Sequence, residues 1–212
     1  MTCSFSENEH VIPPSQLPKI EEMDYVGGGN DWGFTAPSTS YPIGMYKGVW
    51  YVLDEFYEAK VEIDRMGAEM NAQRRKYGVK RFWADSADPA RISHYARSGL
   101  PVYPVVKPRV VQRCQYIDSL FAQGRLIISA SCVNLIRELA TYQWPEGVRD
   151  ESKSNLVGDD HALDAIGYML WSERRMMVAH QPQFPEDDSW GPKVNGEPSE
   201  LQPQMTAGYG EN

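Results

Sequence analysis

Three consecutive glycines followed by an acid constrain this chain more than any other stretch. Residues 27–33 read Gly-Gly-Gly-Asn-Asp-Trp-Gly and follow a short apolar run, Tyr25-Val26. This pattern places Asp31 at the end of a strand. A carboxylate in such a position is costly to remove from water unless a cation or a hydrogen-bond donor meets it. The sequence therefore predicts a partner for Asp31.

Two later stretches supply further carboxylates. Residues 80–84 form a strand-like run that stops at Asp85, and residues 159–165 open an apolar helix that carries Asp164. Three carboxylates delivered by two strands and a helix can hold hard divalent cations such as Mg²⁺ or Mn²⁺. We expect Asp31, Asp85 and Asp164 to meet.

Length and composition bound the class of protein. The 212 residues suffice for one α/β domain and are too few for two large ones. The chain has neither an apolar run of membrane-spanning length nor a signal-peptide pattern, so we expect a soluble intracellular protein without a membrane partner. Its cysteines, Cys3, Cys114 and Cys132, lack the spacing of a zinc or redox motif.

The net charge of −8 is unevenly distributed. Residues 1–24 hold five acids and one lysine, and residues 181–212 hold six acids and one lysine. Residues 25–180 therefore hold 18 acids and 19 basic residues. A bound metal would also reverse the local sign at the predicted site. The middle of the chain can thus bind DNA although the whole chain is acidic.

The order of elements predicts a mixed sheet with helices on its faces. We expect residues 1–24 to be a linker or disordered segment, residues 25–177 to form one α/β domain, and residues 178–212 to be a disordered acidic, proline-rich tail. Within the domain, periodicity and turn residues predict strands at 41–46, 48–57, 80–84, 100–106 and 125–128, and helices at 61–77, 90–98, 109–123, 131–143 and 160–175.

The acids of the last helix have a structural alternative. Asp159 and Asp160 stand where a helix begins, so capping and the helix dipole explain them well. Asp160 is also a possible metal ligand, since it shares a helix face with Asp164. Asp164 lies one turn further in, where capping explains it poorly.

The remaining candidates also have two interpretations each. Asp31 can be a turn residue, and Asp85 a second cap beside Asp88. Glu55 ends its strand and is either a fourth ligand, a group that supports the ligands or an ordinary strand-end acid. His161 suits a supporting donor better than a ligand of a hard cation. Lys107 is either a gatekeeper of an edge strand or a contact to a DNA phosphate.

Six stretches together resemble the nuclease domain of the phage terminase large subunit. In the family's order they are Gly-Gly-Asn-Asp-Trp-Gly-Phe, Tyr-Val-Leu-Asp-Glu-Phe-Tyr, Ala-Asp-Ser-Ala-Asp-Pro, the Lys107 strand with its helix and Gly-Arg-Leu-Ile-Ile, Leu-Ile-Arg-Glu-Leu-Ala-Thr-Tyr-Gln-Trp, and Asp-Asp-His-Ala-Leu-Asp-Ala-Ile-Gly-Tyr. They cover about residues 25–175. Singly these motifs are weak, but six in register are specific.

The resemblance implies a ribonuclease H-like fold and a DNA endonuclease that uses two metal ions, Mg²⁺ or Mn²⁺, to cut concatemeric phage DNA during packaging. Its catalytic and metal-binding carboxylates map onto Asp31, Asp85 and Asp164. Asn30 replaces the family's apolar residue, and Pro108-Arg109 replace its small residues after the lysine. The partners implied are double-stranded DNA, the terminase ATPase, the small terminase subunit and the portal protein, in the cytoplasm of the host cell.

The family's large subunit also has an ATPase motor, whose phosphate-binding loop this sequence lacks. We therefore expect a nuclease domain alone, produced by truncation, a split gene or prophage decay. Two alternatives stay open at this point. One is a remnant that binds DNA or the portal without cutting, and the other is a resolvase or transposase of the same fold.

Overall fold

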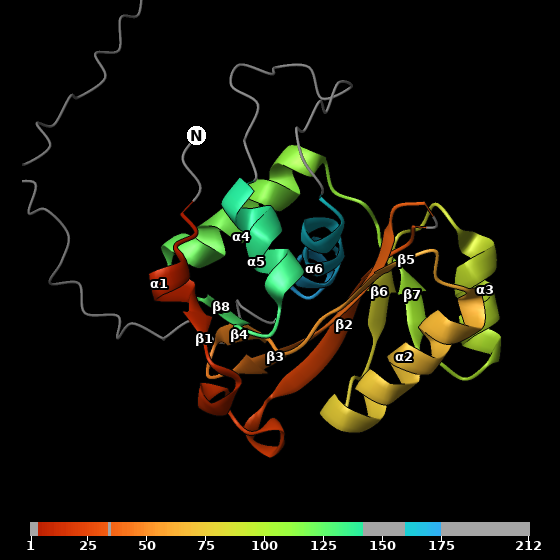
Figure 1. Ribbon diagram of the computed structural model, residues 1–212, viewed down its shortest axis with the longest axis horizontal. Helices are drawn as coiled ribbons and strands as arrows, with labels where there is room; N and C mark the ends of the chain where they lie inside the picture. Colours follow the sequence, from red (N-terminus) through yellow and green to blue (C-terminus); the bar gives the residue numbers. More distant parts are fainter. Residues whose placement is uncertain (1–3, 34, 142–159, 175–212) are drawn as a thin grey trace, which may run out of the picture. The chain divides into compact units, whose positions relative to one another are not determined.

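The computed structural model describes residues 4–33, 35–141 and 160–174 (Figure 1). They all belong to the first of two units, residues 1–181. Its strands are β1 (Val11–Ile12), β2 (Tyr25–Asp31), β3 (Pro37–Tyr46), β4 (Val49–Val52), β5 (Phe56–Ala59), β6 (Phe82–Ala84), β7 (Val102–Pro104) and β8 (Leu126–Ser129). Its helices are α1 (Glu7–His10), α2 (Ile63–Tyr77), α3 (Pro89–Arg97), α4 (Val110–Ala122), α5 (Val133–Thr141) and α6 (His161–Ser172), with 3₁₀ turns at Pro14–Gln16 and Ile20–Glu22.

These strands form one mixed sheet in the order β1-β8-β4-β3-β2-β6-β7, with β5 also paired to β3. Strand β2 is central, antiparallel to β3 along its whole length and parallel to β6 on its other side. Helices α4, α5 and α6 cover one face of the sheet, and α2 and α3 cover the other (Figure 1). The predicted mixed sheet with helices on its faces is confirmed.

Alternation along the strands divides the apolar side chains between two cores. Tyr41 and Trp50 lie with α4, α5 and α6 in one core, whereas Phe82 and Ala84 lie with α2 and α3 in the other. Trp83, between the last two, packs against the first core. Side chains two residues apart on a strand share a face, so Trp83 and Asp85 project toward α6.

Local sequence signals predict most of the boundaries of helices and strands. Helix α2 ends at Gly78, whose φ of 69° suits a residue without a side chain. Asp88 caps α3 by accepting a hydrogen bond from the Arg91 N–H, with Pro89 at the first helical position. Strand β7 lies at the sheet edge, as the prolines around it predict.

The single strand predicted over residues 48–57 is wrong. The chain leaves β4 after Val52 and resumes pairing as β5 at Phe56. Both strands bind to β3, β4 beside residues 43–46 and β5 beside residues 37–40. Aromatic and β-branched composition alone does not reveal a break of three residues.

The linker predicted for residues 1–24 is also wrong for the residues described there. β1 pairs in parallel with β8, and the buried His10 hydrogen-bonds through Nε2 to the Phe121 carbonyl at 3.0 Å. The Phe5 ring contacts the Phe121 ring edge-on. A four-residue helix and a two-residue strand are too short to show a periodic pattern, so the sequence does not predict them. The predicted tail, residues 178–212, lies outside the described residues.

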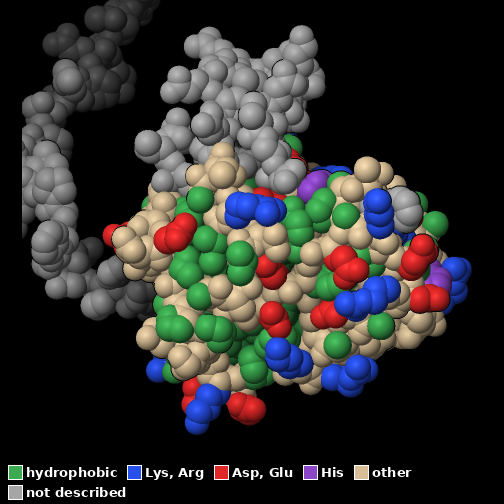
Figure 2. Space-filling model, in the orientation of Figure 1, with side chains coloured by type: hydrophobic (Ala, Val, Ile, Leu, Met, Phe, Trp, Pro, Cys, Tyr) green, Lys and Arg blue, Asp and Glu red, His purple; other side chains and the backbone are tan. Residues whose placement is uncertain are grey.

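Acidic and basic side chains are interspersed over the face in Figure 2, in keeping with the nearly balanced charge of the middle of the chain. Within the described ranges, no helix combines the length and the apolar character that a membrane crossing needs.

Candidate active site

Two neighbouring strands bring Asp31 and Asp85 to the same edge of the sheet. Strands β2 and β6 run in parallel, and their last registered pair is Asn30 with Ala84. Asp31 and Asp85 follow this pair directly, on strands about 4.8 Å apart. Both project toward α6, because Asp31 shares a face with Gly29 and Asp85 with Trp83.

Helix α6 lies directly against β2 because Gly29 has no side chain. A Cβ atom at Gly29 would lie 2.0 Å from the Ala165 carbonyl oxygen. This close approach fixes the part of α6 that carries Asp164, the residue before Ala165. The glycine run that precedes Asp31 therefore admits the helix that supplies the third acid.

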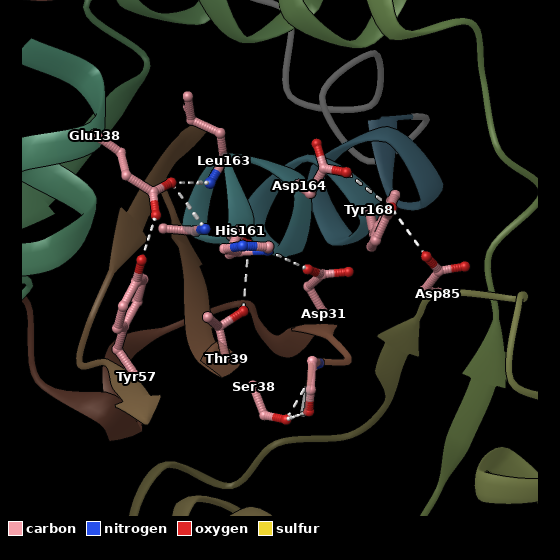
Figure 3. A network of polar contacts seen from close by, with 12 residues as sticks. Asp31, Ser38, Thr39, Tyr57, Asp85, Glu138, His161, Leu163, Asp164 and Tyr168 are labelled. Atoms are coloured by element: carbon pink, nitrogen blue, oxygen red, sulfur yellow. Dashed lines mark hydrogen bonds and ion pairs between the residues drawn. The ribbon is translucent and has the colours of Figure 1, made fainter. Parts of the chain in front are cut away.

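The first turn of α6 is capped by Glu138 of α5. Glu138 Oε2 accepts hydrogen bonds from the N–H groups of Ala162 at 2.9 Å and Leu163 at 3.2 Å, and Tyr57 donates to Oε1 at 3.0 Å (Figure 3). Burial raises the Glu138 pKa to about 7, against the lowering effect of these bonds. Asp160 occupies the N-cap position, but its side chain makes no capping bond. The predicted capping role of Asp160 is wrong, because a side chain from another helix fills it.

His161 lies beside Asp31. Its Nδ1 is 3.1 Å from Asp31 Oδ2, and the Thr39 hydroxyl donates to the His161 carbonyl at 3.2 Å (Figure 3). The hydrogen bond to Asp31 raises the His161 pKa above its usual value. This contact provides the donor that Asp31 requires, and the supporting role of His161 at a metal site stays a prediction.

Asp164 meets a buried arginine, Arg113 of α4. The Arg113 side chain is 4% exposed and pairs with Asp164 Oδ1. Its methylene groups cross the space above Gly167, where a Cβ atom would lie 2.5 Å from Arg113 Cδ. Burial is the main cause that raises the Asp164 pKa to about 6; Arg113 opposes this, and the nearby Asp160 and Asp31 reinforce it.

One hydroxyl lies between the second and third acids. Tyr168 Oη is 3.0 Å from Asp164 Oδ2 and 3.4 Å from Asp85 Oδ2 (Figure 3). Burial raises the Tyr168 pKa far above its usual value, so the hydroxyl keeps its proton. The Arg113 guanidinium lies 4.9 Å from the centre of the Tyr168 ring.

Asp85 also binds a lysine and the turn that follows it. Lys107 Nζ is 2.6 Å from Asp85 Oδ1, which also accepts the Ala87 N–H at 2.7 Å. The structural alternative for Asp85 is a helix cap, but the cap of α3 is Asp88, and Asp85 accepts the Ala87 N–H in the turn that precedes this helix. Lys107 is 41% exposed, so its charge remains open to solvent beside the acids.

The Glu55 carboxylate binds the first turn of helix α5. Its Oε1 accepts bonds from the backbone and side-chain nitrogens of Asn134, both at 2.9 Å, and its Oε2 from the Leu135 N–H at 3.2 Å. These donors belong to the first turn of α5. Glu55 thus caps α5 as Glu138 caps α6, and the described contacts hold it away from the role of fourth ligand.

The chain is similar to large terminases of bacteriophages. It is 28% identical over 153 residues to the terminase large subunit of Escherichia phage T5, covering 69% of this chain and 35% of that protein. The large terminase of a thermophilic bacteriophage superposes with a TM-score of 0.69 at 21% identity, over 80% of this chain and 44% of that one. The nuclease domain of the bacteriophage SPP1 large terminase, with bound Mn, gives 0.62 at 19%, over 77% and 95%.

The fold is that of a large terminase nuclease domain. The ribonuclease H-like fold expected from the sequence is thereby confirmed. The chain spans about a third of the length of the phage T5 relative and most of the length of the SPP1 nuclease domain. No protein-family model matches it.

The donor set of this terminase-type fold suits a hard divalent cation. Asp31, Asp85 and Asp164 offer carboxylate oxygens, and mutual repulsion with Asp31 helps to raise the Asp164 pKa. Among the described residues, however, no three acids, histidines or cysteines stand close enough together to form a metal site as they are. His161, Arg113 and Lys107 each engage one of the acids, so the carboxylates would have to turn from these partners to share an ion.

Sequence reasoning missed Arg113, Tyr168 and Glu138. Arg113 and Glu138 each stand in the apolar stripe of their helix, beside Cys114 and Leu139. A charged residue in such a stripe is a signal of a buried polar partner. Tyr168 lies four residues after Asp164, on the same face of α6.

Proposed function

We propose that this chain is a divalent-metal-dependent endonuclease for double-stranded DNA, of the large terminase type. The observation that carries the proposal is that Asp31 and Asp85 stand at the ends of two neighbouring parallel strands, and that the Tyr168 hydroxyl links Asp85 to Asp164 on the helix that crosses them. The likeness to the phage T5 large subunit and to terminase nuclease domains supports it. In this role the chain would cut concatemeric viral DNA during packaging, in the cytoplasm of the host.

The acids would bind the metal ions, and the neighbouring side chains would orient the acids or contact the DNA. Asp31, Asp85 and Asp164 would hold two ions, Mg²⁺ or Mn²⁺; the SPP1 domain was solved with Mn. Bound ions of this kind activate water and stabilise the leaving oxygen in phosphodiester hydrolysis. His161 orients Asp31, and the Tyr168 hydroxyl orients Asp164 and Asp85. Lys107 would turn from Asp85 to a DNA phosphate.

The terminase setting also suggests partners. We infer that an ATPase motor, a small terminase subunit and the portal protein act with the nuclease. Hydrolysis at a phosphate requires little base recognition, so these partners would choose where the DNA is cut.

Plasmid cleavage tests the proposal. The chain should nick or linearise plasmid DNA with Mg²⁺ or Mn²⁺ and stop when a chelator is added. Asp31→Asn should be inactive, while Asp64→Asn, which changes a side chain that is 97% exposed, should cut as the wild type does. Cleavage that persists in excess chelator, or in Asp31→Asn, would show that another activity is present.

One observation favours a second function. Arg113 neutralises Asp164 inside the protein, so a domain that binds DNA or the portal without cutting could keep this site intact. Metal-replete wild-type protein that binds plasmid DNA but leaves it uncut would support this function against the first.

A further inference from the structure

A hollow lined by two tryptophans lies beside the acidic site. Its volume is about 300 Å³, and its walls are Trp83, Val106, Trp171, Ser172 and Arg174. This volume is at the lower limit of pockets that bind small ligands. It suits one flat ring system and excludes a DNA duplex.

Both tryptophans stand on the elements that carry the acids. Trp83 precedes Asp85 by two residues on the same face of the β6 strand, a distance of about 6.6 Å along the backbone. Trp171 follows Asp164 by two helical turns, with Tyr168 between them on the same face of α6. The hollow therefore continues the row of site residues along β6 and α6.

Neighbouring side chains hold the two indoles in place. Trp83 Nε1 donates a hydrogen bond to Glu173 Oε1 at 2.8 Å. The Trp171 ring meets the Tyr116 ring edge-on at 5.9 Å, and the Arg174 guanidinium lies 4.4 Å from its centre. A ring that is already fixed loses little conformational entropy when it binds a ligand.

The hollow is open to solvent at Val106, which is 88% exposed, and basic side chains stand near its walls. Lys107 follows Val106, is 41% exposed and pairs with Asp85, and Arg81 is 54% exposed and lies 4.0 Å from Glu173, which binds Trp83. Arg174 is also exposed. The acid next to these residues, Glu173, is buried and accepts hydrogen bonds from Trp83 and Tyr25. Fixed aromatic rings beside exposed cations are the usual platform for unpaired nucleic-acid bases.

We propose that this hollow binds one unpaired base of a DNA strand whose backbone passes the acidic site, stacking it on Trp171 and Trp83. The proposal rests on the proposed function, because it takes DNA as the substrate. An unpaired base exposes its ring faces to the two indoles, whereas a paired and stacked base does not. The terminase-type domain would thus hold its DNA locally unpaired next to the phosphate at Asp85.

The test separates the base from the phosphates. Binding of the full chain to an oligothymidylate of about eight nucleotides, typical of a single-strand site, is compared by fluorescence anisotropy with binding to its all-abasic counterpart. Both are measured in chelator, so neither is cut. Wild-type protein should prefer the oligothymidylate by about 5- to 100-fold, the usual effect of one stacked base.

Matched variants locate the stacking site. Trp171→Ala and Trp83→Ala should each lower the ratio of the two affinities to nearly 1, whereas Trp171→Phe should keep most of the preference. Tyr46→Ala, which removes an aromatic ring from the last residue of β3, and Arg75→Ala, on the exposed side of α2, should leave it unchanged. Melting temperatures identify any variant that fails to fold, and quenching of wild-type tryptophan fluorescence by the oligothymidylate provides a second measurement.

The outcomes are distinguishable from those of the cleavage assay. Equal binding of both oligonucleotides by the wild type, or an undiminished preference in folded Trp171→Ala and Trp83→Ala, would overturn the stacking site even if the plasmid is cut. If the preference depends on the tryptophans but the plasmid stays uncut, the base-binding site is supported and the proposed nuclease function is wrong.

Discussion

Asp164 is balanced by a charge inside the protein, and this pairing decides how its removal would affect stability. From sequence alone, loss of one of several neighbouring carboxylates should relieve repulsion. In the structure, Arg113 is buried against Asp164, so the asparagine variant would lose this buried ion pair. Removal of one member of a buried ion pair is costly.

Asp164→Asn should therefore abolish cleavage and also lower the free energy of unfolding, by about 1–3 kcal/mol. Asp160→Asn should retain most activity and change stability by less than about 0.5 kcal/mol, because the Asp160 side chain makes no capping bond. Plasmid cleavage and urea unfolding measure both effects. If Asp160→Asn is inactive while Asp164→Asn cuts normally, the third carboxylate is Asp160.

At the residue scale, the sequence predicted the strand ends and the helix that carry the acids better than it predicted what the acids touch. Spacing and position alone distinguish Asp164 from a cap. The contacts of Arg113 and Glu138 depend on which helix faces lie opposite, and that depends on the packing of α4 and α5 against α6. A single sequence does not specify such packing.

The position of α6 depends on glycines in β2. Gly27 and Gly29 both face the helix, but they lie against different groups of it. A Cβ atom at Gly29 would meet the Ala165 backbone carbonyl at 2.0 Å, whereas one at Gly27 would meet the end of the flexible Met169 side chain at 2.7 Å. A backbone cannot move aside as a side-chain end can.

Gly29→Ala should therefore destabilise the protein by several kcal/mol, on the order of 3 or more, because it displaces α6 from β2. Gly27→Ala should cost less than half as much. Thermal unfolding of the two variants gives the comparison, and plasmid cleavage by Gly29→Ala should fall with the displacement of Asp164. Equal melting temperatures would show that α6 tolerates a shift along β2.

The capping of α6 by Glu138 predicts a pH dependence. Burial raises the Glu138 pKa from 4.5 to about 7, so the folded state binds this proton more tightly than the unfolded state does. The stabilising contribution is complete below the unfolded pKa and is lost as the pH rises through the folded pKa. Glu138→Gln keeps an acceptor for the α6 backbone but does not titrate.

The free energy of unfolding of the wild type, minus that of Glu138→Gln, should fall as the pH rises from about 5 to about 8, by up to about 3 kcal/mol. Denaturant titrations at several pH values measure this difference. A difference that stays constant or grows with pH would mean that Glu138 is ionised throughout.

At the element scale, strong local signals predicted the structure well and weak ones did not. The helices α2, α3 and α4 begin or end at residues whose chemistry marks a boundary, as Gly78 and Asp88 do. The break between β4 and β5 carries no such mark, since residues 53–55 are Leu-Asp-Glu. Its position follows from where β3 offers partners, which is a tertiary effect.

At the scale of the whole molecule, the first described residues belong to the fold. Residues 5–12 contact α4 and β8 through Phe5, His10 and β1. Deletion of residues 1–12 should lower the melting temperature by several degrees, since each kcal/mol corresponds to about 2–4 °C in a domain of this size. Glu9→Gln, at an exposed position in α1, should leave it unchanged. An unaltered melting temperature in the deletion would show that this segment only rests on the domain.

The same segment also has a consequence for how copies of the protein meet. β1 covers the outer edge of β8 at Ile128 and Ser129, and β8, with the sequence Leu-Ile-Ile-Ser, is mainly apolar and free of charge. An uncovered strand of this kind presents a row of unpaired backbone groups to any second chain. By pairing with β8 first, Val11 and Ile12 reserve that edge for the chain itself, and so protect the domain from the aggregation that begins with strand-to-strand contact between molecules.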